Sequence, residues 1–297
     1  MELSSAVLDE VMTWGEALPG FTHRHAKNAL TFVQGYVAGV EDERGQRIEG
    51  IAGGHERFSL FTMDMAWVIW LDDIFDAAGG AGIAPPDIEA IVRAMDDGLP
   101  TTVASQGFPR LRARFARYLD DEAGRRLWVE TAASTVRSWV LEDQLSRGEL
   151  QMSYSEYLEN GIESSAVPHF LATYSLLYGL ELPARLAEPA VRRIARHLSI
   201  QCRLHNDLFS VEKERAEGSG ANAVLLMDRL LPPELSKGFV ADELRGYERL
   251  LATDIATLGT DDPLSRLARL MPASHQRLYA DPRGSYQTAW VPPASRA

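Results

Sequence analysis

The sequence predicts an all-α fold on two observations. Apolar residues recur at three- and four-residue steps over long stretches, and no segment shows the alternation of apolar and polar residues that is typical of strands. Segments rich in glycine and proline, such as "AGGAGIAPPD" and "LLPPELS", interrupt these stretches. Together the two features divide the chain into roughly ten or more helices joined by short loops.

The helices can be placed in order along the chain. The apolar run that ends in "WLDDIFDAAGG", at residues 70–80, indicates an early helix that stops at paired glycines. Further helical periods are found, in chain order, at residues 88–99, 111–121, 125–145, 190–214 and 240–258. Since no repeat, linker or shift in composition separates them, we expect a single domain over residues 1–297, with residues 1–20 and 287–297 loosely ordered.

Composition limits the classes of partner. With 297 residues, of which 45% are hydrophobic, the chain is long enough to bury a sizeable core. The formal charge of −12 and the pI near 5.1 argue against a nucleic-acid surface, because no basic stripe is available to neutralise phosphates. A small anionic substrate would therefore need metal ions in order to bind.

Three further features indicate the compartment. The single cysteine, Cys202, permits no intramolecular disulfide, as is usual in a reducing cytosol. Residues 1–20 lack a basic start followed by an apolar block, so we expect no signal peptide. The longest apolar runs, at 65–71 and 223–227, are too short for a membrane span. We therefore expect a cytoplasmic protein without a transmembrane segment.

Three aspartates, Asp72, Asp73 and Asp76, lie at the end of the early apolar run, where a helix would bring their carboxylates close to one face. Like charges in this arrangement repel one another. A hard divalent cation such as Mg²⁺ would relieve the repulsion, since it binds carboxylates together with waters and substrate phosphates. A solvated acidic helix end is the alternative, and this motif alone does not decide between them.

A second oxygen-rich stripe occurs in "HNDLFSVEKE", where Asn206, Ser210 and Glu214 follow one another at four-residue steps. On a helix these side chains drift by only about 40° per step, so an amide, a hydroxyl and a carboxylate oxygen lie along one face. All are hard donors of the kind that Mg²⁺ prefers. The polar face of an amphipathic helix would explain the stripe equally well, but two such stripes on separate helices favour a metal site.

Together these motifs make the chain resemble the bacterial class I terpene cyclases. The sequence "DDIFD" matches the aspartate-rich motif of that family. The second metal motif of the family is matched by Asn206, Asp207, Ser210, Lys213 and Glu214. The resemblance extends over most of the chain and includes the turn "GSGAN" that follows the second motif.

The resemblance implies a helical bundle around an apolar pocket, with the two motifs facing each other across its mouth. It also implies three Mg²⁺ ions, for which Mn²⁺ can substitute. The implied ligands are Asp72 and Asp76 for two ions and Asn206, Ser210 and Glu214 for the third. Asp73 would complete the catalytic motif, and Lys213 would contact the diphosphate of the substrate directly.

The activity implied by the resemblance is that of a terpene cyclase. Such an enzyme ionises an allylic prenyl diphosphate, here of C15 or C20 length or a bicyclic diterpenyl diphosphate made beforehand by another cyclase. The carbocation becomes a hydrocarbon or an alcohol, and diphosphate is released. No nucleic acid would be a partner, and a homodimer is left open.

Aromatic residues near the two motifs are candidates for the pocket wall, because ring faces stabilise cations and apolar walls exclude water. These aromatic candidates are Trp67, Trp70, Phe75, Trp139, Phe170 and Tyr174. Any one of them is more often explained by ordinary core packing than by contact with a cation. We take Trp67, Phe75 and Phe170 as the substrate contacts.

Two positions depart from the family pattern. An arginine that senses diphosphate is expected upstream of the second metal motif, and alignment on "YLENGIESS" places Asn160 there. A neutral amide cannot make the bidentate charged contact of a guanidinium. In the same segment, Glu163 and Ser164 fall where the family couples this sensor to a helix break whose carbonyl points at the substrate. Near the carboxyl terminus, Arg283 and Tyr286 match an expected Arg-Tyr pair only weakly. With Asn160 at the sensor position, we expect diphosphate binding to depend on the metals, on Lys213 and on an arginine from elsewhere, for which Arg283 and Arg203 are the nearest candidates.

Two other functions stay open. A chain-elongating prenyl transferase would share the fold and the metals, but its second motif should be another aspartate-rich cluster, which Ser210 and Glu214 contradict. A non-catalytic helical binding protein that has kept the fold would explain the absent sensor arginine. It would not explain why both metal motifs are complete.

Overall fold

A computed structural model describes residues 2–37, 54–77, 90–95 and 104–280. Every regular element within these ranges is helical, which confirms the all-α prediction. The elements are α1 (Glu2–Gly15), α2 (His23–Val37), α3 (Gly54–Ala77), η3 (Ala104–Gln106), α5 (Gly107–Phe115), η4 (Ala116–Tyr118), α6 (Glu122–Ser146), α7 (Tyr154–Ser164), α8 (Val167–Tyr178), α9 (Leu182–Arg185), α10 (Pro189–Glu217), α11 (Ala223–Met227), α12 (Pro233–Leu258) and α13 (Pro263–Ala280). Residues 90–95, inside the predicted stretch 88–99, are helical as well.

Three predicted helices are confirmed over their full length. The stretch 125–145 lies within α6, 190–214 within α10 and 240–258 within α12. Helix α6 is capped by Asp121, whose carboxylate accepts hydrogen bonds from two backbone N–H groups of the first turn, each at 3.1 Å. The stretch 111–121 is divided instead, because α5 ends at Phe115 and the 3₁₀ turn η4 precedes this cap.

The amino terminus differs from the prediction that residues 1–20 are loosely ordered. Helix α1 forms there, and Val7, Val11 and Trp14 are buried. These side chains recur at four- and three-residue steps, so they form one apolar face, and α1 packs against α2 and α3. Residues 287–297 lie outside the described residues.

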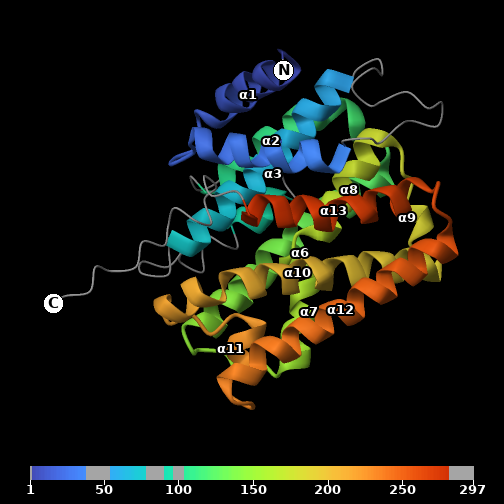
Figure 1. The fold of residues 1–297 in the computed structure, drawn as a ribbon. Coiled ribbons are helices and arrows are strands. Elements are labelled where there is room, and N and C mark those ends of the chain that lie inside the picture. Colours follow the sequence, from blue (N-terminus) through green and yellow to red (C-terminus); the bar gives the residue numbers. More distant parts are fainter. Residues whose placement is uncertain (1, 38–53, 78–89, 96–103, 281–297) are drawn as a thin grey trace.

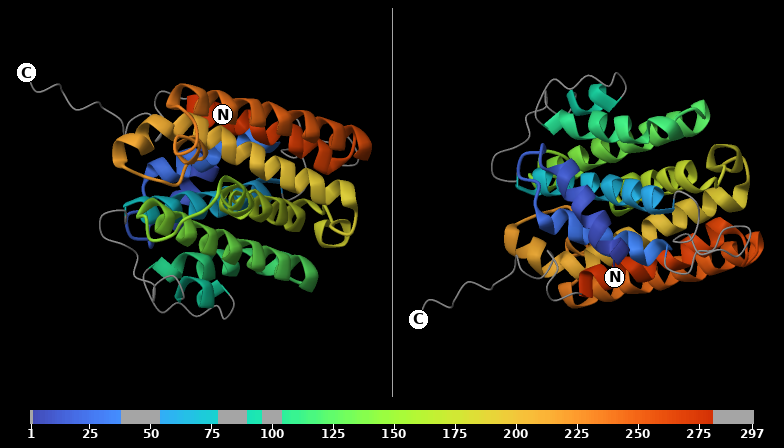
Figure 2. Two further views of the ribbon diagram at one scale, coloured as in Figure 1. Left: turned by 90° about the horizontal axis from the view of Figure 1, so that it is seen from below. Right: turned by 90° about the horizontal axis from the view of Figure 1, so that it is seen from above.

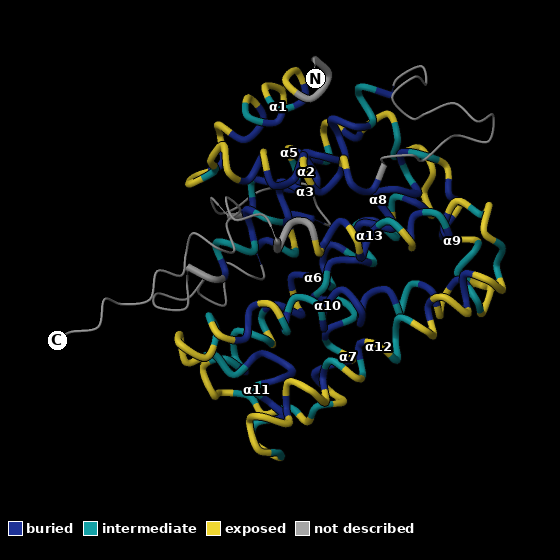
Figure 3. The backbone as a smooth tube through the Cα atoms, in the orientation of Figure 1, coloured by how far each residue is buried: buried dark blue, intermediate teal, exposed yellow. Residues whose placement is uncertain are grey.

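Helix α10, which carries the second motif, packs against five other described helices. These are α7, α8, α11, α12 and α13, and Figures 1 and 2 show α10 running beside α12 along the bundle. Helix α3 packs against α1, α2, α5 and α8. The buried segments in Figure 3 lie where these helices face one another. None of the described helices is long and apolar enough to cross a membrane.

Aromatic side chains fill the core between α3, α5 and α6. Trp67 and Trp128 are at most 1% exposed. The ring of Trp128 stacks on Phe108 and Phe115, with centroids 4.5 and 4.9 Å apart. Aromatic rings bury large apolar areas, so this cluster holds α5 firmly against α6.

The helical path is broken between α7 and α8. Helix α7 begins with a capping box formed by Ser153 and Glu156, and it ends at Ser164. Ala166 follows with a φ of 57°, a left-handed conformation that is uncommon for a residue with a side chain. Pro168 lies in the first turn of α8. Because proline has no N–H, the first helix cannot continue through it.

Candidate functional site

The two predicted metal motifs lie near the carboxyl-terminal ends of α3 and α10. Both helices end on the same side of the bundle, on the left in Figure 1. Asp72 is half-buried near the end of α3, and Asp76 belongs to the same helix although its side chain lies outside the described part of the structure. On α10, Ser210 is buried, and Asn206 and Glu214 are half-buried. The structure therefore places both motifs at the same end of the bundle.

Asp73 has basic partners on another helix. Its Oδ2 atom lies 2.8 Å from Nε2 of the buried His25 and accepts a further hydrogen bond from Arg24, both on α2. Burial alone would raise the pKa of Asp73, but the hydrogen bonds and charges of these two residues outweigh it and lower the pKa. The expected repulsion among all three aspartates therefore does not extend to Asp73, whose charge is balanced without a metal.

Asn222 contacts two residues of the second motif. Its Nδ2 atom donates to the backbone oxygen of Asp207 at 2.8 Å and lies 3.4 Å from Oγ of Ser210. Burial raises the pKa of Glu214, and hydrogen bonds from Ser210 and Asn222 oppose this shift. Oε2 of Glu214 is buried and has no hydrogen-bond partner among the described residues. A bound cation would satisfy this oxygen.

The donors of the second motif fit Mg²⁺. Amide, hydroxyl and carboxylate oxygens are hard ligands, and Mg²⁺ takes few of them from a protein because waters and phosphates complete its shell. Within the described residues, no three His, Cys, Asp or Glu side chains gather into a group that could hold a metal. Amide, hydroxyl and carboxylate donors on one face are of the kind that could hold an ion whose remaining ligands come from waters and phosphates.

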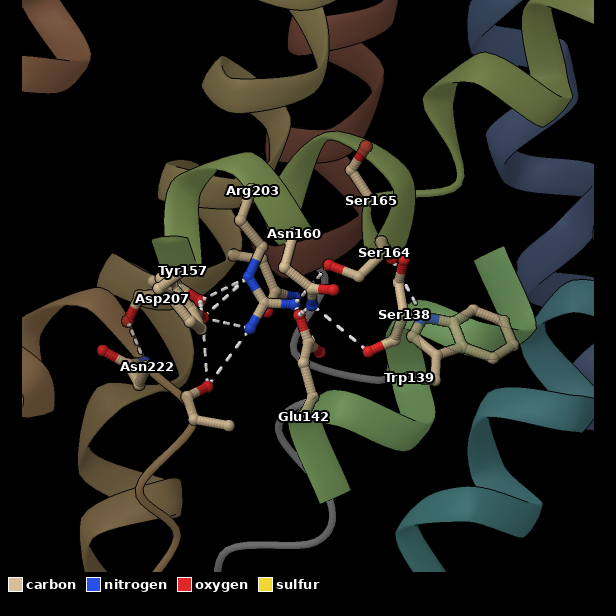
Figure 4. A network of polar contacts seen from close by, with 12 residues as sticks. Ser138, Trp139, Glu142, Tyr157, Asn160, Ser164, Ser165, Arg203, Asp207 and Asn222 are labelled. Atoms are coloured by element: carbon tan, nitrogen blue, oxygen red, sulfur yellow. Dashed lines mark hydrogen bonds and ion pairs between the residues drawn. The ribbon is translucent and has the colours of Figure 1, made fainter. Parts of the chain in front are cut away.

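A buried arginine lies beside Asn160, the residue at the expected sensor position. Arg203 is 9% exposed and stands on α10, three residues before Asn206. Both side chains reach Glu142 of α6 (Figure 4): Nη1 of Arg203 lies 2.9 Å from Oε2, and Nδ2 of Asn160 lies 3.4 Å from Oε1. Asn160 also donates to the backbone oxygen of Ser138 at 3.2 Å. A guanidinium thus occupies this region, and it comes from α10 instead of α7.

Arg203 is held by a tyrosine and two acids. Its Nε atom donates to the hydroxyl of Tyr157 at 2.8 Å and lies 3.0 Å from Oδ1 of Asp207. The Tyr157 hydroxyl lies 3.0 Å from both oxygens of Asp207, to which it donates. Burial raises the pKa of Asp207 to about 7, and the charge of Arg203 opposes the shift. With Glu142, the cluster combines one cation and two acids in a buried position.

Gly161 provides the space for this arginine. A Cβ atom at position 161 would lie 3.0 Å from Cγ of Arg203, closer than ordinary van der Waals contact. The glycine therefore allows α7 and α10 to approach closely. Sequence reasoning identified Arg203 only as a nearby arginine and did not identify Glu142 or Tyr157. The signal for Arg203 was its place one helical turn before Asn206, whereas nothing in the sequence distinguishes Glu142.

The remaining predicted polar residues are placed as follows. Lys213 is half-buried, and its Nζ atom lies 3.9 Å from Glu217. Ser164 is buried at the end of α7, with Oγ 3.5 Å from Nη1 of Arg203. Arg283 and Tyr286 lie outside the described residues. Ser164 is therefore joined to the arginine cluster, whereas Lys213 has a carboxylate neighbour on its own helix.

The predicted aromatic contacts Trp67, Phe75 and Phe170 are all buried. The ring of Phe75 lies edge-on to Trp139 of α6, with centroids 5.8 Å apart. Trp67 packs against Phe108 of α5 at 5.2 Å, so core packing accounts for its position. Phe75 is the aromatic residue of this set that lies within the aspartate-rich motif.

A known protein family matches the part of the chain that contains both metal motifs. Residues 65–230 match the family described as "Terpene synthase family 2, C-terminal metal binding". A curated relative, the ent-pimara-9(11),15-diene synthase of Streptomyces sp. (strain KO-3988), is 31% identical over 215 residues. This alignment covers 68% of the chain and 63% of the relative, so the chain spans somewhat less than two thirds of that protein's length.

Solved structures of low sequence identity share the fold. The 2-methylisoborneol synthase from Streptomyces coelicolor A3(2), in complex with Mg²⁺ and geranyl-S-thiolodiphosphate, is 14% identical with a TM-score of 0.73, over 98% of this chain and 93% of that one. The isoprene synthase from grey poplar leaves (Populus x canescens), in complex with three Mg²⁺ ions and dimethylallyl-S-thiolodiphosphate, is 18% identical with a TM-score of 0.70, over 94% of this chain and 54% of that one.

Proposed function

The chain belongs to the terpene synthase family, and on this premise we propose that it is a class I cyclase that ionises an allylic prenyl diphosphate and cyclises or rearranges the carbocation. The observation that carries the proposal is the stripe of Asn206, Ser210 and Glu214, in which a buried carboxylate oxygen has no hydrogen-bond donor among the described residues. Release of diphosphate leaves a carbocation, which gives a hydrocarbon by losing a proton or an alcohol by adding water and then losing a proton.

Magnesium ions, when bound, would neutralise the charge that builds on the departing diphosphate. Asp72 and Asp76 would hold two ions, and Asn206, Ser210 and Glu214 the third. The Mg²⁺-bound structures of proteins with this fold support this assignment. We expect Mn²⁺ to substitute, because it also accepts oxygen ligands.

Protein cations would complete the diphosphate site. Arg203 is the strongest candidate arginine, because its guanidinium lies beside Asn160 and a guanidinium can grip phosphate oxygens as an amide cannot. Its nitrogens bond Tyr157, Glu142 and the Ala221 oxygen in this structure, so contact with diphosphate would require the exchange of at least one of these bonds. Lys213 lies on the same helix, between two residues of the second motif. Departure of diphosphate from carbon needs no proton donor when metals and these cations stabilise the leaving group.

The carbocation would be held by the apolar interior. Phe75 and Phe170 are the aromatic contacts we propose for it, since ring faces attract cations and buried walls exclude water. The relative that makes a pimaradiene, a diterpene, supports a C20 substrate, either linear or already bicyclic. A C15 substrate is the second choice.

A product assay tests the proposal. Purified protein is incubated with Mg²⁺ and, separately, with C10, C15, C20 and bicyclic C20 diphosphates, and products are read by gas chromatography together with released diphosphate. A cyclic or rearranged hydrocarbon or alcohol supports the proposal. Longer diphosphates formed after addition of isopentenyl diphosphate would identify a prenyl transferase, and ligand binding without diphosphate release would identify a non-catalytic binding protein.

A further inference from the structure

The interruption between α7 and α8 leaves backbone carbonyls that need partners. The last four carbonyls of any helix have no partner within the helix. Three of those in α7 are satisfied from residues 165 and 166: the Gly161 oxygen by Ser165 N at 3.1 Å, the Ile162 oxygen by Ser165 Oγ at 2.9 Å and the Glu163 oxygen by Ala166 N at 3.0 Å. The fourth carbonyl, that of Ser164, receives no such local bond.

The reason lies in Pro168. In a continuous helix the N–H of residue 168 would donate to the oxygen of Ser164, and proline has no N–H. The indole of Trp139 takes its place: Nε1 donates to the Ser164 oxygen at 2.9 Å (Figure 4). One turn earlier on α6, the Thr135 hydroxyl lies 3.0 Å from the Thr131 oxygen of its own helix and 3.2 Å from the neighbouring Glu163 oxygen, so its hydrogen is shared between them. Two side chains of α6 therefore hold the interrupted end of α7.

Ser164 and Trp139 also contact both helices that carry the metal motifs. Oγ of Ser164 lies 3.5 Å from Nη1 of Arg203 on α10. The Trp139 ring lies edge-on to Phe75, which stands between Asp72 and Asp76 on α3. Ser164 thus contacts the arginine assigned above to the diphosphate through its hydroxyl, while its carbonyl accepts a hydrogen bond from a residue that touches the aspartate-rich helix.

We propose that Trp139 is a positioning residue, whose indole N–H fixes the direction of the Ser164 carbonyl beside the carbon that loses diphosphate. This inference rests on the proposed function. A carbonyl oxygen carries partial negative charge, so its direction determines which cationic carbon it stabilises. Without the indole N–H, a buried carbonyl must turn toward another donor, because an unsatisfied polar group is costly in the interior. The distribution of products should then change.

The test compares Trp139→Phe with Trp128→Phe. Trp128 is a matched control, because it stands on the same helix, is fully buried and also donates its indole N–H, to Oγ1 of Thr173 at 3.1 Å. Each variant is assayed for melting temperature, kcat, KM and product ratio on the substrate that the wild type prefers. We expect Trp139→Phe to lower kcat about five- to tenfold at little changed KM and to alter the product ratio. The control should keep the wild-type ratio.

A second variant covers the case in which Trp139→Phe does not fold. Benzothienylalanine at position 139 keeps the ring that packs on Phe75 and removes only the N–H, so we expect it to change the product ratio as well. A wild-type ratio in this variant, or the same kcat and ratio in Trp139→Phe and Trp128→Phe, overturns the inference. Absence of wild-type turnover on every substrate overturns the proposed function itself, which distinguishes the two failures.

Discussion

Replacing Arg203 with methionine removes the one cation of the buried cluster and keeps the apolar stem that passes Gly161. Glu142 and Asp207, with side chains 14% and 0% exposed, would then lose their charged partner. Removing one member of a buried ion pair costs about 3–5 kcal/mol. For a chain of 297 residues, an unfolding entropy of about 2.1 cal/mol/K per residue turns this loss into a fall in melting temperature of about 5–8 °C.

Two properties of Arg203→Met are measured, its thermal stability and its affinity for diphosphate. Thermal denaturation without ligand reports the stability of the cluster. Calorimetric titration of inorganic diphosphate in the presence of Mg²⁺, at a temperature where the variant is folded, reports the proposed contact with the substrate. Loss of a hydrogen bond from a charged group costs about 1.5–3 kcal/mol, so the dissociation constant should rise roughly 10- to 150-fold.

Arg196→Met is the control. Arg196 lies on the same helix and pairs with Glu159 of α7, but the two side chains are 41% and 59% exposed, so its loss should cost less than about 1 kcal/mol. If Arg203→Met melts no lower than this control, the stabilising role that we assign to the buried cluster is wrong. A lower melting temperature with unchanged diphosphate affinity would make Arg203 a structural residue only.

Three further predictions concern other parts of the molecule. Asp72→Ala and Asn206→Ala should each lower turnover by orders of magnitude with unchanged helical circular dichroism. A chelator should abolish the activity of the wild type until Mg²⁺ is restored. Full turnover in both variants would refute the metal assignment. Lys213→Ala should lower kcat/KM by about one to two decades and Asn160→Ala by less than tenfold, because only the former removes a charged contact; a hundredfold loss for Asn160→Ala at unchanged stability would show that the amide is catalytic. Burial lowers the pKa of His275 from 6.5 to about 3, so the unfolded chain binds the proton more readily. The contribution of neutral His275 to the free energy of unfolding should therefore be fully present above pH 6.5 and fall as the pH is lowered, by about 2 kcal/mol at pH 5. Denaturant titrations of His275→Gln should lack this pH-dependent contribution.

The helices were predictable because their period is a local property. Helices α6, α10 and α12 each bury one face against neighbours, and that face is written in the three- and four-residue steps of their apolar residues. The same signal was present in α1, where Val7, Val11 and Trp14 repeat at these steps. The expectation that residues 1–20 are loosely ordered did not take this period into account, and the buried face packs α1 against α2 and α3.

The candidate site was predictable only where its residues share one helix. The steps from Asn206 to Ser210 and Glu214 place three oxygen donors on one face without any knowledge of the fold. The partner of Asp73 could not be derived in this way, because Arg24 lies 49 residues earlier and reaches it only through the packing of α2 on α3. Pairings between distant segments depend on the tertiary structure, and periodicity carries no information about them.

The neutral residue at position 160 becomes understandable once that packing is known. Glu142 already accepts the guanidinium of Arg203 at 2.9 Å, and Asn160 reaches its other oxygen at 3.4 Å. A second arginine at position 160 would bring two like charges to one carboxylate in a buried place, where repulsion is screened little. An amide can share the carboxylate without this cost, since it donates a hydrogen bond and carries no charge. Asn160 therefore fits a site whose positive charge enters from α10, and the departure at this position goes together with Arg203 and the space that Gly161 leaves for it.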